Sequence, residues 1–156
     1  MAWSRTDYDA YWDKEVGYDD NYSVAFDRDE NSKKASTWFN SCYFGFPGEF
    51  MKTRGKTFRV SAMVKTENLT GEAKLCVVNG RGNFAIPGYS NGDPASSQLQ
   101  YVYAEALTGT NDWTPVSLEF TGIDGNAVFY LTYIQMIATG EGKAWFDNVK
   151  IECISE

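Results

Sequence analysis

Residues 57–66 read TFRVSAMVKT, a stretch in which apolar side chains recur at every second position. Phe58, Val60, Ala62 and Val64 would share one face of an extended chain, because successive strand residues point to opposite sides. The opposite face would carry mostly polar side chains. A period of two with one apolar face predicts a half-buried β-strand.

The same alternation recurs along the chain between clusters of Gly, Asn, Asp and Thr, and no amphipathic helix with caps can be drawn. A second clear strand covers 114–121, with Val116, Leu118 and Phe120 on its core face. Further strands are expected at 22–28, 36–46, 73–78, 98–107, 127–137 and 143–152. Eight or nine short strands predict an all-β fold, a two-sheet antiparallel β-sandwich or jelly roll. The Gly- and Pro-containing stretch 79–96 is expected to be a long loop, either functional or a plain surface excursion.

The composition fits one domain over residues 1–156 and excludes several functions. Fourteen Lys and Arg against twenty-one Asp and Glu give a net charge of −7, which would repel nucleic acids and anionic membranes. The chain has no histidine, which excludes Ser-His-Asp and Cys-His chemistry and the commonest zinc sites. Aromatic residues make up 16%, more than a core of this size needs, so we expect exposed rings of the kind that stack on sugars.

Cys42, Cys76 and Cys153 cannot all pair with one another and show no close spacing, so we expect small buried thiols. The chain has neither a run of about 18 apolar residues nor the apolar segment of a secretory signal at its start. It is therefore cytoplasmic or a module cut from a larger protein, and we favour the second interpretation.

Three stretches together resemble a known family. Residues 55–66 (GKTFRVSAMVKT), 108–117 (TGTNDWTPVS) and 142–151 (GKAWFDNVKI) are similar, in order and spacing, to strands of carbohydrate-binding modules of the galactose-binding-like jelly-roll type, including families four and twenty-two. The resemblance runs loosely over residues 18–152 and is more specific for the fold than for the ligand.

That resemblance implies a non-catalytic module that binds plant cell-wall polysaccharide such as β-glucan or xylan. Modules of this type usually sit beside a covalently linked catalytic domain in secreted or cellulosomal enzymes, which implies an extracellular location. No membrane or nucleic-acid partner is expected.

In such modules the glycan lies along the concave face of one sheet, and the resemblance makes Trp38 the first candidate for a stacking platform. Only one of Trp38 and Phe39 can face outward, so a core position for Trp38 is the alternative. Tyr101 and Tyr103 share a strand face with rings about 6–7 Å apart, comparable with successive sugar rings. Whether that face is inside or outside is open.

Tyr133 and Gln135 resemble the Tyr-x-acid or Tyr-x-amide pair that reaches the cleft in family twenty-two. An outward orientation would bury Thr132, which then needs a hydrogen bond, so the opposite orientation stays open. Asn79 and Arg81, on the expected loop, could bond sugar hydroxyls or simply be solvated. Trp113 and Trp145 belong to the recurring motifs and are expected to be structural.

The resemblance also implies a structural Ca²⁺ bound by Asp147, with Asp19 and its neighbours Asp20 and Asn21 supplying further oxygens. The usual N-terminal Phe-Glu pair is not recognisable here, which puts the ligand set in doubt. Such an ion would staple the chain ends together and take no part in catalysis.

The sequence is compatible with one other function and argues against a second. A structural or protein-interaction β-sandwich of a cell-surface, cellulosomal or phage protein predicts buried aromatics and no sugar site. A glycoside hydrolase needs two carboxylates about 5–10 Å apart across a cleft. Most acids here cluster in expected turns such as 27–30, so the chain is not expected to be an enzyme.

Overall fold

The computed structural model describes residues 3–6, 8–44, 55–83, 93–122 and 129–155, with side chains except those of 41–44, 81–83, 93–99 and 129–131. Every regular element in these ranges is a β-strand, which confirms the all-β prediction. The strands are β1 (Trp3–Arg5), β2 (Ala10–Asp13), β3 (Ser23–Arg28), β4 (Ser36–Phe44), β5 (Thr57–Asn83), β6 (Asp93–Tyr103), β7 (Leu107–Thr121), β8 (Phe129–Ala138) and β9 (Gly142–Cys153). These ranges contain no helix with the length and hydropathy needed to cross a bilayer.

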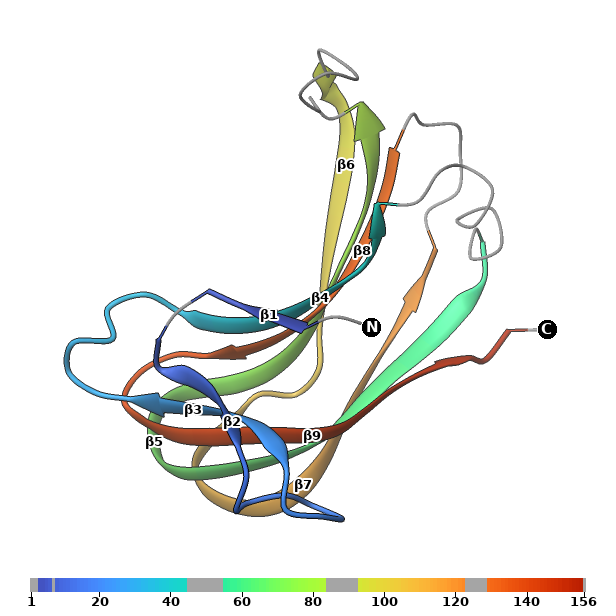
Figure 1. Ribbon diagram of the computed structural model, residues 1–156. Coiled ribbons are helices and arrows are strands. Elements are labelled where there is room, and N and C mark those ends of the chain that lie inside the picture. The colour runs from blue at the N-terminus through green and yellow to red at the C-terminus, as the bar shows by residue number, and fades with distance from the viewer. Residues whose placement is uncertain (1–2, 7, 45–54, 84–92, 123–128, 156) are drawn as a thin grey trace.

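The 27-residue strand β5 belongs to both layers of the fold (Figure 1). Its first half, 57–67, pairs with β7 and β9, while its second half, 73–83, pairs with β6 and β8. One layer therefore has the strand order β7-β5-β9-β3-β2, and the other has β6-β5-β8-β4-β1. All pairs are antiparallel, as predicted for a jelly roll. Register shifts between Val64 and Ala73, and the positive φ of 49° at Asn68, mark where β5 turns from one layer into the other.

The core lies between the layers and is built from the predicted apolar faces. Val60, Ala62 and Val64 are buried, and the Phe58 ring stacks on Phe120 with centroids 5.5 Å apart. The predicted core face of β7 is also buried, with Val116, Leu118 and Phe120 at 5–6% exposure. Burying each large side chain contributes about 1.5–3 kcal/mol, so these faces hold the two layers together.

The prediction of a loop over 79–96 is wrong at both ends of that range. Strand β5 continues to Asn83 and pairs there with Asp93 of β6, so the two strands form a long hairpin. Gly80 is tolerated inside β5 because it is paired with Leu99 on one side and Leu131 on the other, and this ladder offsets the weak strand preference of glycine. Residues 84–92 lie outside the described part of the chain.

One end of the sandwich is tied by Arg28, which is 4% exposed. Its guanidinium donates to five acceptors: the carbonyls of Gly140 (2.7 Å), Ser32 (3.0 Å) and Lys34 (2.8 Å), the carboxylate of Asp9 (3.1 Å) and the Ser36 hydroxyl. A buried guanidinium is stable only with such complete pairing. Arg28 therefore links the β3–β4 connection to the β8–β9 turn.

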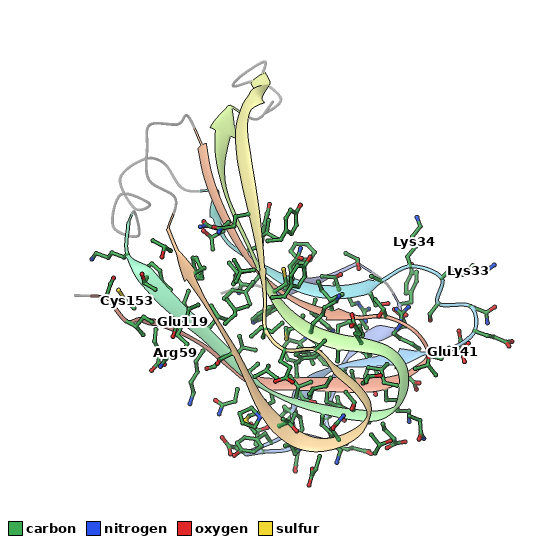
Figure 2. The ribbon with its side chains drawn as sticks, turned by 180° about the vertical axis from the view of Figure 1, so that it is seen from behind. Lys33, Lys34, Arg59, Glu119, Glu141 and Cys153 are labelled. Atoms are coloured by element: carbon green, nitrogen blue, oxygen red, sulfur yellow. The ribbon has the colours of Figure 1, made fainter. Side chains whose placement is uncertain are left out.

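The outer face of the layer containing β7 and β9 is polar. Arg59 on β5 pairs with Glu119 on β7 at 2.8 Å, with both side chains about half exposed. Figure 2 shows this pair and Cys153 on the same side of the molecule.

The three cysteines were expected to be buried. This prediction is wrong for Cys153, which lies at the end of β9 and is exposed. Cys76 is buried as predicted, and the side chain of Cys42 lies outside the described part.

Candidate functional site

Strand register brings four predicted site residues onto one face of the other layer. Tyr101, Val78 and Tyr133 lie opposite one another on β6, β5 and β8. The next row holds Tyr103, Cys76, Gln135 and, on β4, Phe39. Directly opposite residues share a sheet face. We define the tyrosine face by its ring and amide side chains: Tyr101, Tyr103, Tyr133, Gln135 and Phe39.

The β6 tyrosines are the most open part of this face. Tyr101 is 55% exposed and Tyr103 52%, which answers the open question of their orientation. Cys76 and Val78 lie between the β6 and β8 members and are almost completely covered. Phe39 meets the Tyr133 ring edge-on, with centroids 6.3 Å apart. The face thus presents two accessible rings beside a half-buried group of two rings and an amide.

The orientation of Tyr133 and Gln135 is set by the opposite face of β8. Ile134 and Met136 are 2% and 1% exposed and pack in the core. The Thr132 hydroxyl, which this orientation turns inward, donates to the Asn79 side-chain oxygen at 3.4 Å. The structure therefore selects the orientation in which Tyr133 and Gln135 point outward.

The prediction that Trp38 is a stacking platform is wrong. Trp38 pairs with Met136 in register and is 3% exposed, so it cannot be a stacking platform. Its indole packs on Trp12 at 5.3 Å, and Nε1 donates to the Ala25 carbonyl at 3.4 Å. The large ring fills the space between the layers, and strand alternation then turns Phe39 outward.

Asn79 is a second correction. Its side chain is buried, and its Nδ2 donates to the Thr121 carbonyl at 3.0 Å, so Asn79 links the two layers and cannot reach a ligand. Arg81 pairs through its backbone with Gln98 and Tyr130, and its side chain lies outside the described part.

The electrostatics of the tyrosine face favour neutral hydrogen-bonding groups. Burial raises the pKa of both Tyr103 and Tyr133, so their phenols stay protonated at neutral pH and can donate and accept. Burial also raises the pKa of the Cys76 thiol, which keeps it in its unreactive form. Lys74 lies 5.3 Å from the centroid of the Tyr103 ring and is held by Glu72 at 2.9 Å. None of the five side chains that define the face is a carboxylate.

Sequence reasoning missed Lys74 and did not assign Phe39 to the site. The signal for Phe39 was its position beside Trp38, but choosing between the two required knowing which face of β4 is buried. Trp145 is structural as expected, because it is buried and its Nε1 donates to Asp13 at 2.9 Å.

The carboxylate of Asp147, the expected calcium ligand, accepts two backbone hydrogen bonds. Its Oδ2 accepts from the Tyr18 backbone N–H at 2.7 Å and its Oδ1 from the Asn148 N–H at 2.6 Å. Asp19 is exposed. Over the described ranges no group of three or more His, Cys, Asp or Glu side chains could hold a metal ion. The bond from Tyr18 to Asp147 joins the N-terminal segment to β9. Calcium binding by Asp147 and Asp19 stays a prediction.

Several solved structures share this fold. The second family 16 carbohydrate-binding module matches with a TM-score of 0.61 at 13% identity, covering 93% of this chain and 86% of that one. The CBM22-2 xylan-binding domain from Paenibacillus barcinonensis matches with a TM-score of 0.64 at 10% identity, covering 97% and 91%. The CBM22-1 and GH10 modules of a Clostridium thermocellum xylanase, complexed with xylohexaose, match with a TM-score of 0.64 at 14% identity, covering 99% of this chain and 26% of that one. At these identities the matches confirm the expected fold.

Sequence comparison gives a different kind of relative. The tRNA nuclease WapA of Bacillus subtilis strain 168 is 35% identical over 91 residues, which is 56% of this chain. The chain spans 4% of the length of that relative. No family model matches the sequence.

Proposed function

We propose that this chain is a non-catalytic polysaccharide-binding module and that the tyrosine face is its glycan site. The observation that carries this proposal is the pair of half-exposed rings, Tyr101 and Tyr103, on one strand face opposite Tyr133 and Gln135. Residues two apart on a strand are about 6–7 Å apart, comparable with successive pyranose rings. An open row of rings suits an extended glycan chain.

Each group on the face has a distinct role. Tyr101 and Tyr103 stack against the apolar C–H faces of neighbouring sugar rings. The neutral Tyr133 hydroxyl and the Gln135 amide exchange hydrogen bonds with sugar hydroxyls, because both can donate and accept. Lys74 packs beside Tyr103 and holds that ring in place, which lowers the ordering cost of binding.

The ligand class we propose is a plant cell-wall β-glycan such as xylan or β-glucan, and the setting is a larger extracellular protein. Two observations support this setting. Matching structures include a xylan-binding domain and a module joined to a GH10 module, and the chain spans only a small part of its curated relative. Binding would raise the local concentration of a linked catalytic domain at its substrate.

Affinity electrophoresis tests the proposal. The purified chain and its Tyr101→Ala/Tyr103→Ala variant are run in gels containing xylan, β-glucan, xyloglucan, glucomannan, pectin or no polysaccharide. Tyr8→Ala is the matched control, because Tyr8 is 99% exposed and lies outside the tyrosine face. We expect one polysaccharide class to retard the wild type and Tyr8→Ala equally, and to retard the double variant less. Repeating the gels with calcium and then with a chelator tests the calcium prediction.

The second candidate is a structural or protein-interaction module without a sugar site. The WapA match favours it, because a segment 35% identical to this chain lies in a tRNA nuclease, a protein whose name refers to tRNA and to no polysaccharide. This candidate predicts uniform migration in every gel. Binding of the chain to tRNA is not expected, because its net charge is −7. A gel shift with tRNA at low salt checks this point.

A further inference from the structure

A pocket lies on the opposite side of β8 from the tyrosine face. Its volume is about 340 Å³, within the roughly 300–1,000 Å³ of small-molecule sites. Ile134 and Met136 of β8 form part of its floor, together with Phe146 of β9. Tyr133 and Gln135 point the other way along the same strand, so no member of the tyrosine face lines this pocket.

The pocket has two indoles at its sides, one from each short edge strand. Trp3 comes from β1 and Trp12 from β2. The Trp12 ring leans on the buried Trp38 ring at an angle of 59° and is still 53% exposed. Trp12 is therefore a ring that is held by the core and keeps about half of its surface free. Such a fixed ring can stack on a ligand at little cost in side-chain entropy.

Polar groups stand beside these rings. Asp20, Asn148 and Lys150 are among the residues that line the pocket, as is Tyr22, which is 57% exposed. Asp20 is held in place because its Oδ1 accepts from the Tyr22 backbone N–H at 2.7 Å. Sugar hydroxyls require hydrogen-bond donors and acceptors, and a sugar C–H face requires an accessible aromatic ring. The residues around this pocket include all three kinds of group.

We infer that this indole pocket is a second saccharide site, which takes a chain end or a branch of one or two pyranose rings. Its limited volume selects short saccharides, whereas the open tyrosine face suits the middle of a chain. The inference extends the proposed function to a second set of residues and does not depend on the tyrosine face. Together the two sites would give bivalent binding to a branched glycan, with higher apparent affinity than either alone.

Tryptophan fluorescence separates the two sites, because the tyrosine face contains no tryptophan. The probes are xylobiose, cellobiose and β-1,4-galactobiose, titrated into the wild type, Trp12→Ala, Asp20→Asn and Tyr101→Ala/Tyr103→Ala. Trp113→Phe is the matched control, since Trp113 does not line the pocket. Circular dichroism confirms that each variant is folded, and Asp20→Asn removes an exposed charge without touching the core.

We expect one disaccharide to change the emission of the wild type, the tyrosine double variant and Trp113→Phe. The change should disappear in Trp12→Ala, and the affinity should fall at least fivefold in Asp20→Asn. An equal response in Trp12→Ala, or no response to any probe in the wild type, would overturn the inference. If Trp12→Ala loses retardation in the polysaccharide gels and the tyrosine double variant keeps it, the pocket stands and the tyrosine-face proposal fails.

Discussion

The two faces of the layer formed by β6, β5, β8 and β4 are both rich in large apolar side chains, but only one is open to solvent. Trp38, Leu75 and Met136 form one row on the inner face, and each is at most 3% exposed. Tyr103 and Gln135 belong to the adjacent row on the outer face. Neighbouring residues on the same strands therefore have different roles, one in the core and the other at the surface. Inner substitutions should change stability, and outer ones should change binding.

Trp38→Ala should give the largest effect. Removing a buried indole leaves a cavity between the layers and should lower the free energy of unfolding by about 3–5 kcal/mol. Phe39→Ala, at the adjacent half-buried position, is the matched control and should lower the free energy of unfolding by about 1 kcal/mol. Urea denaturation followed by circular dichroism measures both. A Trp38→Ala protein of unchanged stability would contradict the placement of this indole between the layers.

Asn79→Ala should give the next effect. The substitution leaves Thr132 without its side-chain partner and removes the link to the Thr121 carbonyl, at a cost of about 1–3 kcal/mol. Glycan affinity of the folded protein should stay unchanged.

A double-mutant cycle with Thr132→Val isolates the Asn79–Thr132 contact, and the cost of the double variant should be less than the sum of the single costs. Strict additivity would contradict the claim that Asn79 satisfies the half-buried Thr132 hydroxyl.

The contrast between the faces also shows which features could be predicted from the sequence. The alternation in 57–66 and 114–121 identified core faces correctly, because each stretch has one clearly apolar side. In 36–46 both sides carry apolar or aromatic residues, so the choice between Trp38 and Phe39 depends on the register with β8. Register is a tertiary property, and a shift of one residue exchanges the two faces.

The glycines of β5 explain why a loop was wrongly predicted over 79–96. The glycines in 80–82 indicated a loop, and Asn79 was accordingly placed at the surface. Pairing with strands on both sides of β5 keeps this segment extended and carries Asn79 into the core. Strands β1 and β2 were not predicted, because three and four residues are too few to show a period.

Substitutions on the outer face should leave stability nearly unchanged. Tyr101→Ala and Tyr103→Ala each remove a half-exposed ring and should each weaken glycan binding about tenfold, which corresponds to about 1.4 kcal/mol. Their free energies of unfolding should change by no more than about 0.5 kcal/mol, as for other surface positions. Isothermal titration calorimetry measures the glycan affinity of each variant, and urea denaturation of the same samples measures its stability. A loss of stability as large as that of Asn79→Ala would place these rings in the core.

The smallest effect concerns pH. Burial raises the pKa of Tyr133 above its ordinary value of 10.0, so the folded protein holds this proton more tightly than the unfolded chain does. The associated stability is intact below pH 10 and is lost as the pH rises through the folded pKa. The difference in absorbance at 295 nm between the wild type and Tyr133→Phe reports this single phenol. We expect its transition above pH 10, with glycan affinity falling over the same range. A transition below pH 10 would mean that Tyr133 is as solvated as an isolated tyrosine and is not the half-buried outer residue described here.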